Sequence, residues 1–184
     1  NERDEYRDSD PYDVVGSGGE PIPFHAHRLR GTLLALEHVL RSGPERSKIL
    51  DIGCGAGVLT AAIRRRFSAA TLFAIDASLT AIISANEQFA GIDFAVGDAF
   101  TLPYSSGYFD VVVCNNIWEH VSDPLRLLES VRRVLAPGGV IVISTPNRYR
   151  LSNLSRVLRG EPVTFLSGHH VTEYTIGQVL ELLH

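Results

Sequence analysis

Three glycines at alternate positions, Gly53, Gly55 and Gly57, follow an apolar run in the stretch "ILDIGCGAGVLT", residues 49–60. Glycine lets a backbone lie against a bound molecule, because any side chain would block the approach. The loop opens a predicted helix, so its N–H groups and the helix dipole favour a negative or polar ligand. The dinucleotide fingerprint needs a glycine where this chain has Val58, and the lysine of the phosphate-binding P-loop is absent. The loop therefore predicts a ligand site of another kind, with a packing turn as the alternative.

Polar residues also follow the later apolar runs of the sequence. Asp76 ends "TLFAID", Asp98 lies in "VGDAF", Asn115 ends "VVVCN", and His120 lies in "NNIWEHVSDP". A carboxylate such as that of Asp76 can accept bonds from two hydroxyl groups at once. An imidazole has an ordinary pKa of about 6.5, which suits proton removal near neutral pH. The alternatives are a loop carboxylate or helix cap for each acid, and a loop-fixing role for the histidine.

The elements that must position these residues alternate between strand and helix. Short apolar runs predict strands, and segments with apolar residues at helical spacing predict the helices between them. This order predicts the α/β class: a Rossmann-like, doubly wound, mostly parallel sheet in a three-layer α/β/α arrangement. Ligands of such sheets bind outside the carboxyl ends of the strands, where the polar residues would meet. The predicted strands are 48–52, 71–76, 92–97, 109–116 and 140–146, and the predicted helices are 26–43, 57–67, 79–90, 123–135 and 175–183.

The pattern D-x-G-x-G-x-G from Asp51 to Gly57 resembles the first motif of class I S-adenosylmethionine-dependent methyltransferases, and the resemblance covers residues 48–146. It implies that Asp76 holds the ribose hydroxyls, that Asp98 lies near the adenine, and that Asn115 faces the amino-acid part of the cofactor. A basic residue from the N-terminal helix would lie near the cofactor carboxylate. The residues assigned to S-adenosyl-L-methionine are Asp51, Gly53, Cys54, Gly55, Gly57, Asp76, Ala77, Asp98, Ala99, Asn115 and Arg28.

The segment after the fourth strand resembles that of ubiquinone-biosynthesis O-methyltransferases, which also carry Glu-His. The resemblance implies a small-molecule acceptor, oxygen rather than nitrogen, with His120 as the catalytic base. Small-RNA terminal ribose methyltransferases instead hold a divalent ion with Glu-x-x-Glu-His and a distant histidine. This chain has Asn116 in place of the first glutamate, but keeps Glu119, His120 and either His169 or His170. Because neighbouring helical side chains point about 100° apart, we expect no metal site.

The sequence thus predicts an S-adenosylmethionine-dependent methyltransferase of a small-molecule acceptor. The alternative is a catalytically silent cofactor-binding subunit that supports a partner enzyme. A nicotinamide-dependent dehydrogenase ranks third, because the third glycine is displaced from the dinucleotide pattern. The cofactor motif alone does not separate the first two; the histidine and a substrate-sized cavity do.

Composition limits the partners and the compartment. The net charge of −4 argues against a general nucleic-acid binder, and no apolar run approaches the ~20 residues of a membrane helix, so neither nucleic acid nor membrane is an expected partner. Two cysteines, Cys54 and Cys114, make no disulfide framework, which favours a cytoplasmic setting. The oligomeric state stays open, with a homodimer as one option.

We expect residues 1–24 to form an N-terminal arm and residues 25–184 a single methyltransferase domain. Residues 147–170 would form a lid over the acceptor. Four arginines lie in this lid with only Glu161 against them, and a solvated helix face is favoured over an anion site. The family's sheet normally ends with two further strands after the segment 175–183, so the C-terminal strands are expected to be missing from this chain.

Overall fold

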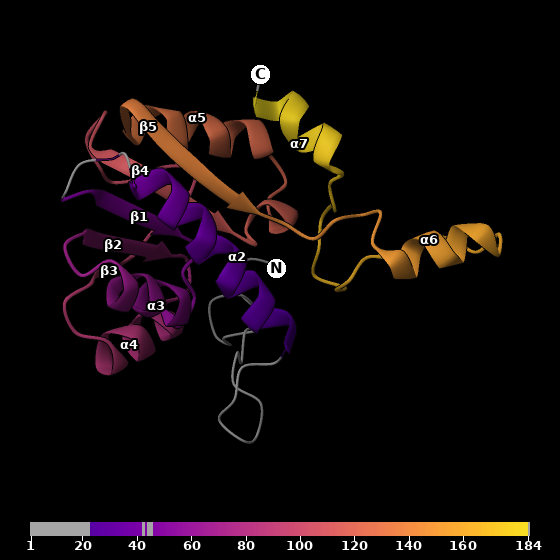
Figure 1. Cartoon of the computed structure of the whole chain (residues 1–184), viewed down its shortest axis with the longest axis horizontal. Helices are drawn as coiled ribbons and strands as arrows, with labels where there is room; N and C mark the ends of the chain where they lie inside the picture. The colour runs from indigo at the N-terminus through magenta and orange to yellow at the C-terminus, as the bar shows by residue number, and fades with distance from the viewer. Residues whose placement is uncertain (1–22, 42, 44–45, 184) are drawn as a thin grey trace.

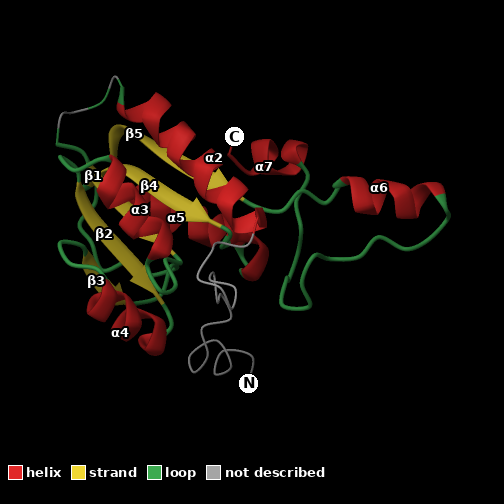
Figure 2. Ribbon diagram, turned by 60° about the horizontal axis from the view of Figure 1, so that its bottom comes forward, coloured by secondary structure: helices red, strands yellow, loops and turns green. Residues whose placement is uncertain are grey.

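The centre of the protein is a five-stranded sheet in the order β3-β2-β1-β4-β5, with every neighbouring pair parallel (Figures 1 and 2). The structure is a computed structural model that describes residues 23–41, 43 and 46–183. The sheet confirms the predicted α/β class. Its strands are β1 (Lys48–Ile52), β2 (Thr71–Asp76), β3 (Asp93–Val96), β4 (Phe109–Asn115) and β5 (Leu135–Ser144).

Helices cover both faces of this sheet, as the doubly wound arrangement predicts. Helices α2, α3 and α4 pack on one face, and α5 packs on the other with α7 beside it. A polar side chain begins two of them: Ser78 Oγ accepts a bond from the Ala81 N–H in α4, and Asp123 accepts one from the Arg126 N–H in α5. The helices are α2 (Pro23–Leu40), α3 (Val58–Arg66), α4 (Leu79–Gln88), the 3-10 helix η1 (Trp118–His120), α5 (Pro124–Val134), α6 (Leu151–Leu158) and α7 (Ile176–Leu183).

The central strands bury apolar side chains on both faces, because side chains alternate along a strand. On β4, Val111 and Val113 join the core under α2 and α3, whereas Val112 and Cys114 join the core under α5. Both faces must therefore be covered. This packing holds the carboxyl ends of β1, β2 and β4 at one edge of the sheet.

Two elements begin three or more residues before their predicted starts, whereas the other predicted elements agree within one or two residues at each end. Helix α2 begins at Pro23, inside the expected arm, and residues 1–22 of that arm lie outside the described residues. Strand β5 begins at Leu135, because the "APGG" segment continues the strand through a register shift opposite Phe109 and Val111.

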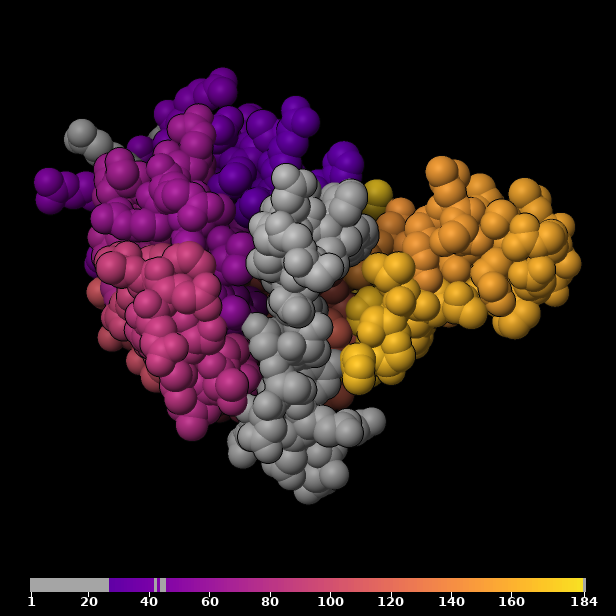
Figure 3. All heavy atoms as spheres, turned by 90° about the horizontal axis from the view of Figure 1, so that it is seen from below, coloured from indigo at the N-terminus to yellow at the C-terminus, as the bar shows by residue number. Residues whose placement is uncertain are grey.

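The segment after β5 leaves the body of the molecule. Helix α6 projects away from the sheet, and the space-filling view shows the same projection (Figures 1 and 3). Its buried residue is Asn153, whose amide donates to the carbonyls of Arg148 and Thr164. Over the described residues, no helix is long and apolar enough to cross a membrane.

Candidate active site

The glycine loop joins β1 to α3 at the carboxyl edge of the sheet. Gly53, Gly55 and Gly57 all have positive φ, at 73°, 52° and 79°, a conformation that other residues adopt at a cost. At Gly57 a Cβ atom would also lie 2.8 Å from Cζ of Phe94. Glycine is therefore needed here partly for backbone conformation and for packing within the chain itself. This agrees with the alternative of a packing turn.

Asp76 connects the loop after β1 to the loop after β2. Its Oδ2 accepts from the Gly55 N–H and its Oδ1 from the Ser78 N–H, both at 2.8 Å. A carboxylate has about four acceptor positions, so two bonds leave capacity for hydroxyl donors. The neighbouring Ala77 is exposed. The expected ribose ligand thus also fixes the shape of the glycine loop.

Asp51 is a buried carboxyl group with one satisfied oxygen. The Thr60 hydroxyl donates to its Oδ2 at 2.6 Å, while Oδ1 is buried and has no hydrogen-bond partner among the described residues. Burial raises the pKa of Asp51 to about 7, and the Thr60 hydrogen bond and the charge of Arg28 lower it only in part. An unpartnered buried oxygen is costly, so this atom fits a cationic or donor group of a ligand.

The next two predicted cofactor positions lie after β3. Asp98 is exposed, and its Oδ1 accepts from the Phe100 N–H at 2.9 Å, while the half-buried Ala99 packs against the core under α5. The Asp98 side chain therefore stabilises its own loop, which is the loop-carboxylate role given above as the alternative to cofactor binding.

Asn115 ends β4 and ties three elements together. Its Oδ1 accepts from the hydroxyl of Ser144 at the end of β5, and from that of Thr32 in α2 at 3.4 Å. Helix α2 also carries Arg28, whose charge acts on Asp51, Glu119 and His120. The structure thus brings Arg28 to the same edge as the glycine loop.

The chain turns sharply after β4. Asn116 has a φ of 55°, a value that asparagine tolerates better than most residues. The turn leads directly into η1, which contains Glu119 and His120. His120 is half-buried, and its Nδ1 lies 3.3 Å from the carbonyl oxygen of His169. A carbonyl only accepts, so Nδ1 carries the proton and the neutral ring has its lone pair on Nε2.

The pKa values of Glu119 and His120, both in η1, shift in opposite directions. Burial, followed by the charge of His170, lowers the pKa of His120 to about 4, so this imidazole is neutral near pH 7. Burial raises the pKa of Glu119 to about 7, although the Thr145 hydroxyl donates to its Oε2 at 3.1 Å. The second oxygen, Oε1, is buried and has no hydrogen-bond partner among the described residues.

A third side chain completes this cluster. One ligand atom each from Glu119, His120 and His170 lie within 4.8 Å of one another. The expected divergence of neighbouring side chains does not keep these ligand atoms apart, although Glu119 and His120 lie in a 3-10 turn, whose successive residues point about 120° apart. The Val171 N–H donates to the Glu119 carbonyl at 2.7 Å, which brings the later segment over the turn. A carboxylate and two imidazoles are a donor set that fits a divalent cation.

Three of the four lid arginines contact residues of the lid itself, and Arg150 contacts a residue just beyond it. Arg156 and Arg159 both pair with Glu161, whereas Arg150 pairs with the buried Glu173. Arg148 lies over the ring of Phe165. The sequence analysis did not single out three residues that prove to be partners in this region: Glu173, Thr60 and Thr145. The one sequence signal that could have indicated any of them is the i, i+3 spacing of His170 and Glu173.

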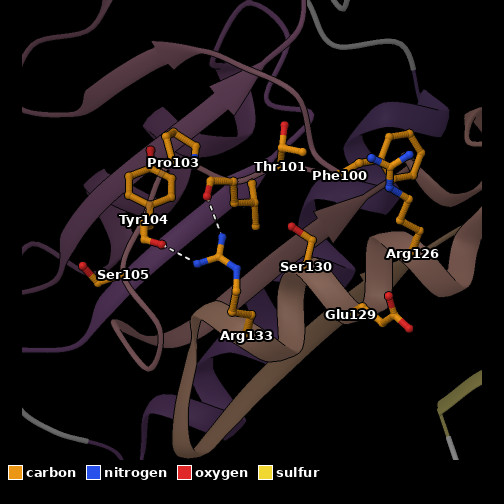
Figure 4. Close-up of a pocket in the computed structure, with 10 residues that line it drawn as sticks. Phe100, Thr101, Pro103, Tyr104, Ser105, Arg126, Glu129, Ser130 and Arg133 are labelled. Atoms are coloured by element: carbon orange, nitrogen blue, oxygen red, sulfur yellow. Dashed lines mark hydrogen bonds between the residues drawn. The ribbon is translucent and has the colours of Figure 1, made fainter.

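A cavity of about 730 Å³ lies between α5 and residues 100–105 (Figure 4). The Arg133 guanidinium donates to the carbonyls of Leu102 and Tyr104 at 2.6 Å each, and Arg126 lies 5.2 Å from the centre of the Phe100 ring. None of the residues predicted to hold cofactor or acceptor lines this cavity. The predicted residues gather instead at the edge formed by the glycine loop and η1, which is the candidate site.

Comparison with known proteins agrees with the fold and the loop. Residues 50–143, slightly more than half of the chain, match the family described as "Methyltransferase domain". The chain therefore belongs to this methyltransferase family.

Two curated relatives share one name, ubiquinone biosynthesis O-methyltransferase. The ubiquinone biosynthesis O-methyltransferase of Histophilus somni is 34% identical over 131 residues, which are 66% of this chain and 54% of that protein. The enzyme of the same name from Psychrobacter arcticus is 36% identical over 135 residues, 69% of this chain and 51% of that protein. The chain spans about half the length of these relatives.

Solved structures share the architecture. A methyltransferase from Methanosarcina mazei, described as SAM-dependent, superposes with a TM-score of 0.62 at 25% identity, over 79% of this chain and 81% of that chain. The [4+2]-cyclase SpnF superposes with a TM-score of 0.68 at 25% identity, over 84% of this chain and 56% of that chain. The plantazolicin methyltransferase BpumL, solved with SAH, gives 0.67 at 24% identity, over 88% and 63%. The cyclase illustrates that one fold hosts more than one chemistry.

Proposed function

We propose that this chain binds S-adenosyl-L-methionine and transfers its methyl group to a small-molecule acceptor, at oxygen rather than nitrogen. The observation that carries the proposal is the unpartnered buried Oδ1 of Asp51 beside the positive-φ glycine loop. Family membership and the names of the curated relatives support it. The bound cofactor would supply a methyl group already activated by a positively charged sulfur.

The residues of this chain would then bind and orient. Asp76 would accept the ribose hydroxyls with its remaining acceptor positions, and Asp51 would face the ammonium group. Arg28, from α2, lies near enough to Asp51 to influence its charge and would favour the cofactor carboxylate. Positioning of two reactants accounts for about 7–11 kcal/mol of a barrier, so these contacts would provide much of the catalysis.

His120 would remove the proton of the acceptor hydroxyl. Its imidazole is neutral near pH 7, and its Nδ1–H contact with the His169 carbonyl keeps the lone pair on Nε2. Residues 147–170 would close over the acceptor from the side of η1. A hydroxyl acceptor needs such a base, whereas a neutral amine needs little help.

The experiment has two arms. Calorimetry with S-adenosylhomocysteine and with NAD tests the cofactor, and binding of NAD alone would exclude the proposal. Transfer of a labelled methyl group from S-adenosylmethionine into a small-molecule extract tests the activity, and mass spectrometry identifies the product. Cofactor binding without any transfer would favour a silent cofactor-binding subunit.

A second candidate mechanism is supported by the cluster of Glu119, His120 and His170. Their ligand atoms approach within 4.8 Å, and the buried Glu119 Oε1 is unpartnered among the described residues. These residues would hold a divalent cation, which would lower the pKa of the acceptor hydroxyl. Chelator treatment separates the two mechanisms: turnover that is lost with chelator and restored by a divalent ion favours the cation.

A further inference from the structure

The most completely satisfied buried group beside the site is the carboxylate of Glu173, which the proposed reaction does not itself use. We propose that Glu173 is a positioning residue: it holds the proton of His170 on Nδ1 and thereby keeps the lone pair on Nε2, available to the centre formed with Glu119 and His120. The inference deepens the proposed function and rests on it for its catalytic consequence, but its structural content can be tested separately.

Glu173 is 1% exposed, and its carboxylate lies within hydrogen-bond distance of three separate parts of the lid. Its Oε2 accepts from the Arg150 guanidinium, and its Oε1 accepts from the Leu166 N–H. Nδ1 of His170 lies 2.9 Å from the same Oε1. The carboxylate therefore joins the start of α6, the following loop and His170.

The charge state of Glu173 decides the direction of the last bond. Its Oε2 is paired with the guanidinium of Arg150, which is always charged, and its Oε1 accepts from the Leu166 N–H, so both oxygens face donors. The group is therefore an ionised carboxylate at neutral pH, and an ionised carboxylate only accepts. His170 must donate from Nδ1, so the nitrogen of the neutral ring that can accept or ligate is Nε2.

The orientation matters because His170 faces the reaction centre. Its ring centre lies 5.0 Å from that of His120, with the rings nearly perpendicular. His120 has the same tautomer, since its own Nδ1 is next to the His169 carbonyl. The two imidazoles are thus held alike, one by a carbonyl and one by a carboxylate: each has its proton on Nδ1, and in the neutral form of either ring the lone pair is on Nε2. Both base catalysis and cation binding need that lone pair.

The outer partner of a functional histidine fixes both its tautomer and its ring orientation. Without Glu173, the proton of His170 is free to move to Nε2, which removes the acceptor from the centre. Arg150 would at the same time lose its buried counter-charge. We expect the effect on turnover to exceed any effect on cofactor affinity, because Glu173 bonds to lid residues, whereas the proposed cofactor contacts lie on the glycine loop.

The test is NMR of the full chain with 15N-labelled histidine, without cofactor or acceptor. Two-bond 1H–15N correlations report the tautomer of each neutral imidazole, and His170→Gln assigns the signal. We expect the Nδ1–H form at His170 in the wild type and a shift toward the Nε2–H form in Glu173→Ala. The matched control is Glu161→Gln, because Glu161 is an exposed lid carboxylate paired with arginines and should leave the His170 signal unchanged.

A wild-type His170 with its proton on Nε2 would overturn the inference, and this arm does not depend on any variant folding. An unchanged tautomer in a folded Glu173→Ala would overturn it equally. Once an acceptor is known, Glu173→Ala should lower kcat about 10–100-fold, the usual effect of losing such an outer partner, with the Kd of S-adenosylhomocysteine unchanged. Failure of methyl transfer in the wild type would contradict the proposed function and leave the tautomer result standing.

Discussion

Asp51 should make cofactor binding depend on pH, and the structure sets the sign of that dependence. The perturbation is a pH series of S-adenosylhomocysteine binding to the wild type and to Asp51→Asn. In the ligand-free protein, burial raises the pKa of Asp51 to about 7. Its Oδ1 has no hydrogen-bond partner in the part of the chain that the structure describes. A ligand ammonium beside this oxygen favours the ionised form and lowers the pKa in the complex. Binding therefore releases a proton wherever free Asp51 is still protonated.

The magnitude follows from the raised pKa. At pH 6, about nine-tenths of the free protein has Asp51 protonated, so binding should release close to one proton. Over the range in which Asp51 is protonated when free and ionised when bound, affinity rises about tenfold per pH unit, or ~1.4 kcal/mol. Above about pH 7 the free carboxyl group is already ionised. The affinity should therefore increase up to about pH 7 and stay level above it.

Isothermal titration calorimetry at pH 6 in two buffers of different ionisation enthalpy measures the released proton directly. Asp51→Asn should bind more weakly above pH 7 and lose the pH dependence. Glu119→Gln is the matched control, because Glu119 also has a pKa raised to about 7 but belongs to the η1 cluster. Heats that do not depend on the buffer, or an Asp51→Asn variant that keeps the slope, would refute the reasoning.

Three further outcomes test individual residues. Gly57→Ala should reduce the free energy of unfolding in urea by about 2–5 kcal/mol, from positive-φ strain and from overpacking against Phe94; a loss below about 1 kcal/mol would show that the backbone relaxes. Asp76→Ala should weaken S-adenosylhomocysteine binding by about 1–3 kcal/mol in calorimetry, because Gly55 and the ligand both lose an acceptor; an unchanged Kd would remove Asp76 from the site. His120→Ala should lower turnover about 10²–10⁴-fold with cofactor affinity retained, and wild-type turnover that needs a divalent ion would contradict the base role.

The sequence by itself determined the order of strands and helices and indicated the edge of the sheet at which a ligand is expected. Apolar alternation and helical spacing are local patterns, so β1, β2 and β4 could be placed within a few residues. The glycine loop could also be predicted from the sequence, because positive φ at a position favours glycine there whatever the rest of the chain does. Gly53, Gly55 and Gly57 all have positive φ. The rule that ligands bind at the carboxyl ends of parallel strands then selected the candidate edge from topology.

Only the tertiary structure decided which polar groups meet. Thr60 is the partner of Asp51, and His170 reaches Glu119 across a long stretch of chain. The divergence expected for adjacent side chains did not keep the ligand atoms of Glu119 and His120 apart, although both residues lie in a 3-10 helix, where successive side chains point about 120° apart. Hydrogen-bond partners, burial and therefore pKa depend on distances between segments remote in sequence, and a single sequence carries no direct record of those distances.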